Sequence, residues 1–272
     1  MNMDLSKVRL VVTDMDGTLL NNKSQVSTNF FKLFSQLKKH NIHFVAASGR
    51  QYYSIANKLH TIKDEIFIVA ENGGLTTSKS QELLSVNLPQ EKVHDILPIL
   101  RNLDSVYTVL CGKRSAYIET RNERFISKFN EYYTTYEIVD DLTTVIDDDF
   151  FKIAIYHFES SEKFIYPVLK HLEDDLQVKI SGENWLDISS QAANKGNALR
   201  FIQSKLGIGK EETMVFGDYN NDLEMLEEAY FSFSMDNAHS NVKKIARFNT
   251  KSNEEGGVEF ILTKLLKAKE LS

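Results

Sequence analysis

The first apolar run of the chain lies in the stretch Leu10-Val-Val-Thr-Asp-Met-Asp-Gly-Thr-Leu-Leu20, and it ends abruptly at Asp14. A second acid, Asp16, follows two residues later and precedes Gly17 and Thr18. The apolar, β-branched residues predict a buried strand. Ligands bind beyond the carboxyl ends of the strands in open α/β sheets, so two acids at this position indicate a catalytic crevice. The stretch alone is equally compatible with an acidic turn, because Asp-Gly is a common turn pair.

Composition narrows the class of protein. The chain has 272 residues, of which 42% are hydrophobic and 26% are charged, which is typical of a globular protein with one large or two ordinary domains. The net charge of −6 argues against a nucleic-acid partner. There is no signal-like or membrane-spanning apolar segment, so we expect no membrane partner. The single cysteine, Cys111, cannot form an internal disulfide, and we expect a cytoplasmic protein. The sequence does not indicate an oligomeric state.

Strand-like and helix-like segments alternate in the first and last parts of the chain. The strand-like runs are Val8–Thr13, His43–Ala47, Ile66–Ala70, Thr213–Phe216, Tyr230–Ser234 and Ala246–Asn249. Apolar residues at helical spacing predict helices over Val26–Lys39, Lys195–Leu206 and Asp222–Glu228, and a terminal helix after Gly256-Gly257. Such alternation favours βαβ units, so the sequence predicts an α/β fold with a parallel sheet.

The middle of the chain has a different pattern. Hairpins are predicted for Val106–Leu110 with Ala116–Glu119 and for Val178–Ile180 with Trp185–Ser189, and a strong strand for Phe150–Phe158. Helices are predicted over Glu91–Leu103 and Ser161–Asp174, although Pro98 and Pro167 lie inside them. We therefore predict a discontinuous core of residues 1–82 and 190–272 and an inserted α+β domain of residues 83–189 with antiparallel strands.

Two short segments of the alternating part carry polar groups at strand ends or helix starts. Ser48-Gly49-Arg50 directly follows a strand-like run, and its hydroxyl and backbone N–H groups could hold a phosphate oxygen. Taken alone, it is more typical of an ordinary turn with a Ser cap. Lys195 opens a predicted helix and could aim its charge inward, although most such lysines are solvated.

A third polar segment, Gly217–Asp222, follows the run Met214-Val215-Phe216. Its two acids, Asp218 and Asp222, and two amides within five positions suit a hard cation with oxygen ligands. The alternative is a polar turn that caps the next helix.

Together these residues form the set that phosphoryl transfer through an aspartyl-phosphate requires. Asp14 and Asp218 would hold Mg²⁺, whose charge lets a carboxylate approach an anionic phosphate. Asp14 would attack phosphorus, and Asp16 would protonate the leaving oxygen and then deprotonate the hydrolytic water. Ser48, Lys195 and backbone N–H groups would hold the phosphoryl oxygens.

These motifs resemble a known family. Asp14-Met15-Asp16-Gly17-Thr18, Ser48-Gly49-Arg50, Asn194-Lys195-Gly196 and Gly217-Asp218 with Asn221-Asp222 resemble the four motifs of the haloacid dehalogenase superfamily. Glu71-Asn72-Gly73-Gly74 resembles a segment of its Cof-type sugar-phosphatase branch. The sequence departs from the branch at Ala192-Ala193-Asn194, where relatives often have Gly-Val-Ser, and at Gly74, where Ala is commoner. Neither departure involves a predicted catalytic group.

The resemblance implies a Rossmann-like core with Asp14 on its first strand, and an α/β cap inserted between the second and third motifs. The cap would close over the substrate and exclude water. The resemblance also implies Mg²⁺ held by Asp14, the backbone carbonyl of Asp16, and Asp218. Asn221 and Asp222 would support the phosphate and the metal shell, while Gly49 and Arg50 would join Ser48 at the phosphate.

The leading hypothesis is a Mg²⁺-dependent phosphatase for small phosphorylated metabolites such as sugar phosphates. A phosphomutase or phosphotransferase on the same scaffold is the alternative. A non-catalytic phosphoacceptor module is disfavoured by Asp16 and by the large insertion. In the insertion, Trp185, Tyr117, Glu119 and Arg114 could read the leaving group, although strand packing explains the aromatic residues equally well. Asp147-Asp148-Asp149 is predicted to be a solvated loop, and Cys111 to be structural.

Overall fold

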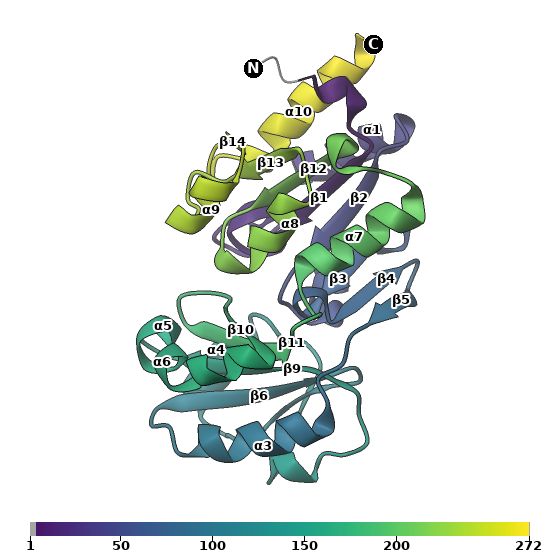
Figure 1. The fold of residues 1–272 in the computed structure, drawn as a ribbon. Coiled ribbons are helices and arrows are strands. Elements are labelled where there is room, and N and C mark those ends of the chain that lie inside the picture. Colours follow the sequence, from purple (N-terminus) through teal and green to yellow (C-terminus); the bar gives the residue numbers. More distant parts are fainter. Residues whose placement is uncertain (1–3, 272) are drawn as a thin grey trace.

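Two β-sheets, each with its own helices, make up the computed structural model, which describes residues 4–271 (Figure 1). We call the eight-stranded sheet with its helices the core and the six-stranded sheet with its helices the cap. In Figure 1 the core lies above the cap, and both ends of the described chain lie at the end of the core that is remote from the cap.

The core sheet has the strand order β14-β13-β12-β1-β2-β3-β4-β5. Neighbouring strands from β14 to β3 are parallel, whereas β4 and β5 add an antiparallel edge. The strands are β1 (Leu10–Asp14), β2 (His43–Ala47), β3 (Phe67–Ala70), β4 (Leu75–Ser78), β5 (Gln81–Ser85), β12 (Thr213–Gly217), β13 (Phe231–Ser234) and β14 (Phe248–Asn249).

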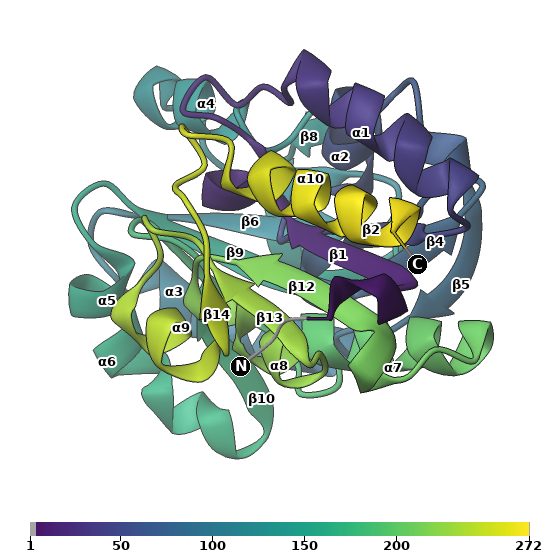
Figure 2. The same ribbon diagram turned by 90° about the horizontal axis from the view of Figure 1, so that it is seen from above.

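Helices cover both faces of this sheet, with α1 and α10 on one side and α7, α8 and α9 on the other (Figure 2). Helix α1 begins after Ser27, whose side chain accepts a hydrogen bond from the backbone N–H of Phe30. Helix α7 begins after Asn194 and ends at Leu206, and the next residue, Gly207, has left-handed backbone angles. The core helices are α1 (Thr28–Lys39), α2 (Tyr52–Lys58), α7 (Lys195–Leu206), α8 (Leu223–Glu227), α9 (Ser240–Ile245) and α10 (Gly257–Glu270).

The cap sheet has the order β10-β11-β9-β6-β7-β8. Its strands are β6 (Val106–Gly112), β7 (Ala116–Ile118), β8 (Tyr136–Ile138), β9 (Phe150–His157), β10 (Leu176–Ile180) and β11 (Trp185–Ser190). Its helices are α3 (Gln90–Arg101), α4 (Glu123–Phe129), α5 (Ser161–Phe164) and α6 (Tyr166–Leu169). Short 3₁₀ turns and one π turn, Met15–Leu19, complete the secondary structure.

The predicted fold class, an α/β Rossmann-like parallel core with an inserted α+β cap, is confirmed, but three details differ. Strands β7 and β8 are parallel, so the antiparallel prediction is wrong for this pair. The predicted helix over Ser161–Asp174 is broken into α5, α6 and a 3₁₀ turn, because Pro167 supplies no N–H at the start of α6. The β4–β5 hairpin was not predicted, since its strands are short and partly polar.

The boundaries predicted for the domains, at 82/83 and 189/190, lie close to where the chain passes between the sheets. Strand β5 of the core ends at Ser85, and strand β11 of the cap ends at Ser190. The exact division stays a prediction, and its outermost residues, 1–3 and 272, lie outside the described part.

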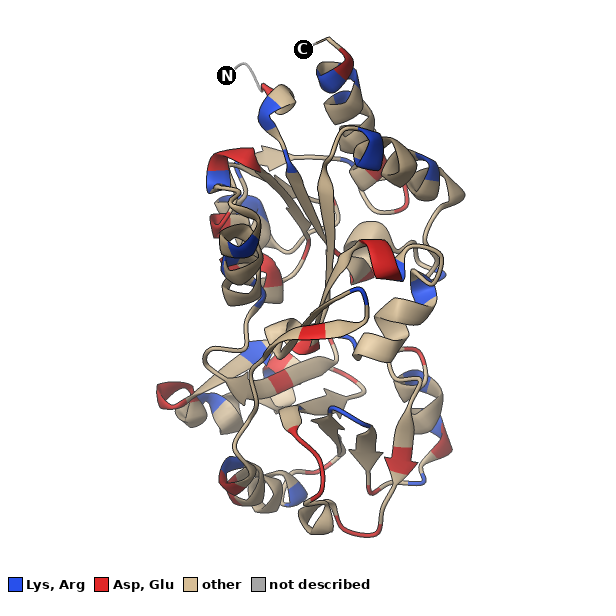
Figure 3. Cartoon of the chain, turned by 90° about the vertical axis from the view of Figure 1, so that its right-hand side faces the viewer, with Lys and Arg blue, Asp and Glu red and all other residues tan. Residues whose placement is uncertain are grey.

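Charged residues of both signs occur on the helices of the core and of the cap (Figure 3). Within residues 4–271, no helix combines the length and the apolar character that crossing a bilayer requires.

Candidate active site

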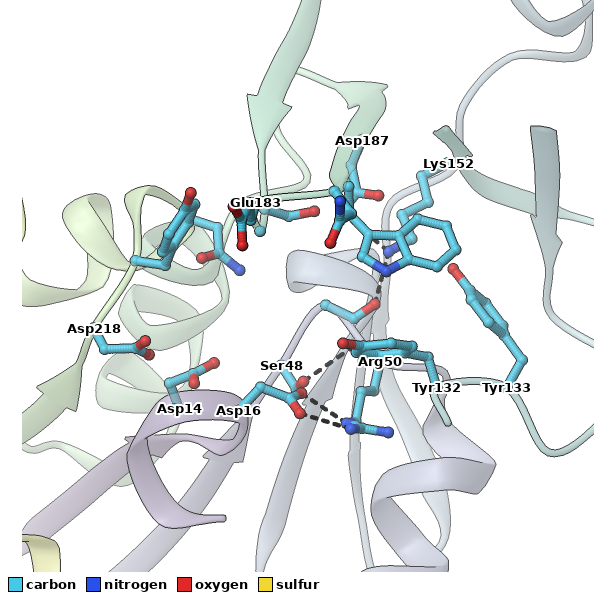
Figure 4. Close-up of a pocket in the computed structure, with 18 residues that line it drawn as sticks. Asp14, Asp16, Ser48, Arg50, Tyr132, Tyr133, Lys152, Glu183, Asp187 and Asp218 are labelled. Atoms are coloured by element: carbon cyan, nitrogen blue, oxygen red, sulfur yellow. Dashed lines mark hydrogen bonds and ion pairs between the residues drawn. The ribbon is translucent and has the colours of Figure 1, made fainter. Parts of the chain in front are cut away.

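A pocket of about 360 Å³ lies where the carboxyl ends of the core strands face the cap (Figure 4). This size suits a small-molecule ligand. The core contributes Asp14, Asp16, Ser48 and Asp218 to its wall, and the cap contributes Tyr132 and Lys152 together with the β10–β11 turn.

Asp14 ends strand β1, whose five residues are all buried, and the chain then turns sharply. Gly17 has a φ of 74°, and a Cβ atom there would lie 2.3 Å from Oδ2 of Asp218. Thr18 donates a hydrogen bond to Oδ1 of Asp218 at 2.9 Å. Glycine at position 17 therefore lets the first and fourth motifs approach one another.

Three carboxylates gather beneath the pocket. Asp14, Asp218 and Asp222 are buried, and ligand atoms from all three lie within 4.8 Å of one another. Burial raises the pKa of Asp14 to about 8, although the neighbouring Lys195 opposes this shift. Burial, followed by the charges of Asp14 and Asp222, also raises the pKa of Asp218 well above its usual value. Such a concentration of oxygen ligands and negative charge fits a hard divalent cation.

Lys195 is fully buried behind Asp14 at the start of α7. Its Nζ lies 2.5 Å from Oδ1 of Asp14 and 2.7 Å from Oδ1 of Asp222. The other oxygen of Asp222 accepts hydrogen bonds from the backbone N–H groups of Asp218 and Tyr219. Both oxygens of Asp222 thus accept hydrogen bonds from the protein. Neither Lys195 nor Asp222 is part of the pocket wall.

Asp16 lines the same pocket as Asp14 but faces a different partner. Its carboxylate accepts hydrogen bonds from Nε and Nη2 of Arg50, at 2.7 and 2.6 Å (Figure 4). Arg50, which was predicted to bind phosphate, lies on the pocket wall, and its guanidinium contacts Asp16.

Ser48 and Gly49 lie at the end of β2 on the pocket wall. The Ser48 hydroxyl accepts a hydrogen bond from the backbone N–H of Arg50 at 3.1 Å. A Cβ atom at Gly49 would lie 2.9 Å from Oδ1 of Asn72. The same Oδ1 accepts a hydrogen bond from Asn221 at 3.0 Å, so Asn72 ties the second and fourth motifs together.

The cap contributes a buried charged pair that the sequence analysis missed. Lys152 of β9 donates to the carbonyl oxygen of Gly49 at 2.7 Å and lies 3.2 Å from the carboxylates of Glu71 and Asp187. Asn72 also donates to Asp187, at 2.5 Å. A lysine inside the apolar run 150–156 was an available signal, because a charge in a buried strand requires partners.

The other cap residues considered from sequence fall into two groups. Trp185 lines the pocket, whereas Tyr117, Glu119 and Arg114 are not part of its wall. The Tyr117 hydroxyl donates to Asp148 at 2.9 Å, and Asp148 also accepts from the backbone N–H of Arg114. Asp148 is therefore a buried turn-forming residue, and the prediction of a solvated loop is wrong at this position.

Comparisons with known proteins cover nearly the whole chain. The family described as haloacid dehalogenase-like hydrolase matches residues 11–262. The 5-amino-6-(5-phospho-D-ribitylamino)uracil phosphatase YbjI of Escherichia coli (strain K12) is 35% identical, with 96% of this chain and 97% of that protein covered.

Two solved structures share the fold. SMU.1108c from Streptococcus mutans UA159 has a TM-score of 0.89 at 29% identity, with 96% of this chain and 99% of that chain covered. The subclass IIB sugar phosphatase BT4131 has a TM-score of 0.83 at 20% identity, with 94% and 98% covered. The resemblance expected from the four motifs is confirmed: the chain belongs to the haloacid dehalogenase-like hydrolases and is an enzyme of their phosphatase branch.

Proposed function

We propose that the protein is a Mg²⁺-dependent phosphatase that hydrolyses small phosphorylated metabolites through a phosphoryl group carried on Asp14. The observation that carries the proposal is the pair of acids on one pocket wall. Asp14 is buried against Lys195 and the other acids, whereas Asp16, two residues later, has its own partner and faces the same pocket.

In the first step an oxygen of Asp14 forms a bond to phosphorus while the bond from phosphorus to the leaving oxygen breaks. Asp16, protonated at this stage, gives its proton to that oxygen. Ser48 and the N–H groups near Gly49 lie on the pocket wall, where they can hold the phosphoryl oxygens. Lys195 keeps Asp14 in place and offsets part of its negative charge.

In the second step Asp16, now ionised, takes a proton from a water molecule that attacks phosphorus. The bond between Asp14 and phosphorus breaks, inorganic phosphate is released, and Asp16 is protonated again. Each group thus returns to its starting state.

The carboxylates of Asp14 and Asp218 and the backbone carbonyl of Asp16 would hold the magnesium ion. Asp222, whose oxygens already accept from Lys195 and from two backbone N–H groups, would hold the surrounding loop. A bound Mg²⁺ supplies charge neutralisation between the Asp14 carboxylate and the phosphate.

The size and lining of the pocket support a small organic phosphate as substrate. The first candidate substrates to compare are sugar phosphates and 5-amino-6-(5-phospho-D-ribitylamino)uracil, the compound for which the E. coli relative is named. Trp185 and Tyr132 provide aromatic surface for either leaving group.

The test is release of inorganic phosphate from a panel of these compounds, with Mg²⁺ and after chelation. We expect turnover only with the metal, and its loss in Asp14→Asn but not in the exposed control Asp104→Asn. Transfer of the phosphoryl group to a second sugar position without phosphate release would instead support a mutase. Full activity of Asp14→Asn would refute the mechanism.

A further inference from the structure

Arg50 joins the carboxylate of Asp16 to the cap. Two of its nitrogens bind the two oxygens of Asp16, in the bidentate geometry that orients a carboxylate most strongly. The Arg50 side chain is only 2% exposed, whereas that of Asp16 is 39% exposed. Arg50 is thus the fixed partner in this pair, and Asp16 is the one open to the pocket.

The other side of the Arg50 guanidinium faces the cap segment between α4 and β8. Nη1 donates a hydrogen bond to the backbone carbonyl of Glu131, and Cζ lies 4.6 Å from the centre of the Tyr132 ring. Nη1 also donates to the Ser54 hydroxyl of α2, at 3.2 Å. The cap therefore supplies two of the contacts that hold this guanidinium, a hydrogen bond and a cation–π contact.

We propose that Arg50 is a positioning residue that orients Asp16 for proton transfer when the cap is docked on the core. In a docked cap, Glu131 and Tyr132 fix the guanidinium, and the guanidinium fixes the carboxylate. Separation of the cap would remove both cap contacts from Arg50. The acid/base would then be aligned only while the cap covers the pocket, which restricts hydrolysis to the enclosed state. This inference rests on the proposed function.

Gln51 provides a matched control, because it contacts the same cap segment without touching Asp16. Its side chain donates to the carbonyl oxygen of Thr135 at 3.0 Å and accepts from the backbone N–H of Thr135 at 3.3 Å. Loss of Gln51 weakens docking of the cap alone, whereas loss of Arg50 removes both docking contacts and the support of Asp16.

The experiment follows p-nitrophenyl phosphate in a rapid-mixing instrument with wild type, Arg50→Gln and Gln51→Ala. Nitrophenolate leaves without needing a proton, so the first phase tests phosphoryl transfer to Asp14. The second phase tests attack by water and needs Asp16. We expect Arg50→Gln to slow the second phase about 10²-fold, with a much smaller effect on the first, because general acid–base catalysis contributes about 10²–10⁴. Intact-mass measurement after an acid quench should show more phosphorylated protein in Arg50→Gln than in wild type. Gln51→Ala weakens docking but keeps the Arg50–Asp16 pair, so its increase should be much smaller.

Arg50→Lys guards against a folding defect in the glutamine variant. A lysine can reach only one oxygen of Asp16, so the rate of the second phase in Arg50→Lys should lie between the rates in wild type and in Arg50→Gln. A first phase slowed as much as the second, or a raised KM with unchanged kcat, would show that Arg50 binds phosphate and would overturn the inference. If Gln51→Ala and Arg50→Gln slowed the second phase equally, Arg50 would act only as a docking contact, and the inference would be wrong. If wild type shows neither phase, the proposed function itself fails.

Discussion

Asp14 and Asp16 are separated by one residue, yet their side chains have different surroundings. An extended strand would place both on the same face. The strand ends at Asp14, and the π turn over Met15–Leu19, with Gly17 at positive φ, changes the direction of the chain. Asp14 consequently meets Lys195, and Asp16 meets Arg50.

Lys195 should have a large effect on stability. Lys195→Met leaves Asp14 and Asp222 buried without their positive partner, and removal of one member of a buried ion pair costs about 3–5 kcal/mol. Lys205→Met on the exposed side of the same helix should change the free energy of unfolding by less than about 1 kcal/mol. Urea unfolding of the two variants against wild type measures the difference, and equal effects would contradict the structure.

At the residue scale, the sequence predicted which core side chains meet, because the carboxyl ends of parallel strands share one edge of the sheet. It did not predict that Arg50 would face Asp16. The contacts of Arg50 with the cap join residues 81 positions apart, and no periodicity encodes them. Lys152 and Asp187 were missed for the same reason, as they meet partners 103 and 115 positions away.

At the level of elements, Pro98 and Pro167 of the cap should differ in how much they lower the free energy of unfolding. Helix α3 continues through Pro98, which cannot donate a hydrogen bond to the carbonyl of His94, whereas Pro167 stands in the first turn of α6, where no donor is required. Pro98→Ala should therefore raise the free energy of unfolding by about 1–3 kcal/mol. Pro167→Ala should change it by less than about 1 kcal/mol.

Urea denaturation of the full chain, followed by circular dichroism, compares the two proline variants. Stabilisation by Pro167→Ala equal to that by Pro98→Ala would contradict the assignment of α3 as one continuous helix.

The elements with a clear apolar pattern were predictable, and β4 and β5, which lack one, were not. Helices α1 and α7 bury one periodic apolar face, and β1, β2 and β12 are short apolar runs. The antiparallel edge β4–β5 is short and partly polar, with buried threonines in β4 and exposed polar residues at the start of β5, and such a pattern does not differ from that of a loop in sequence. Strands β4 and β5 form because they pair with the edge of the core sheet, and their local sequence does not indicate this pairing.

In the whole molecule, the core and the cap meet at the buried pair of Glu71 and Lys152. Burial raises the pKa of Glu71 to about 7, while the charge of Lys152 opposes the shift. A carboxylic acid whose pKa is higher in the folded state binds its proton more tightly there. Its protonation therefore favours folding at acidic pH, and this contribution is lost as the pH rises through 7.

Glu71→Gln removes this dependence on pH. The free energy of unfolding of the variant minus that of wild type should rise by up to about 3 kcal/mol as the pH increases from 5 to 8. Each unit of pKa shift corresponds to about 1.4 kcal/mol. The measurement is urea unfolding at both pH values, with Glu82→Gln, an exposed core-edge glutamate, as control. A difference between Glu71→Gln and wild type that stays constant with pH would contradict a buried, proton-binding Glu71.

The most direct test of the account is the identity of the phosphorylated residue. The Asp16→Asn variant is mixed with p-nitrophenyl phosphate and Mg²⁺, quenched in acid and digested, and the phosphorylated peptide is located by mass spectrometry. The account predicts one phosphoryl group on Asp14, which accumulates because Asp16 no longer activates water, and none in Asp14→Asn. A phosphoryl group on another residue such as Ser48, or phosphate release from Asp14→Asn at the wild-type rate, would contradict it.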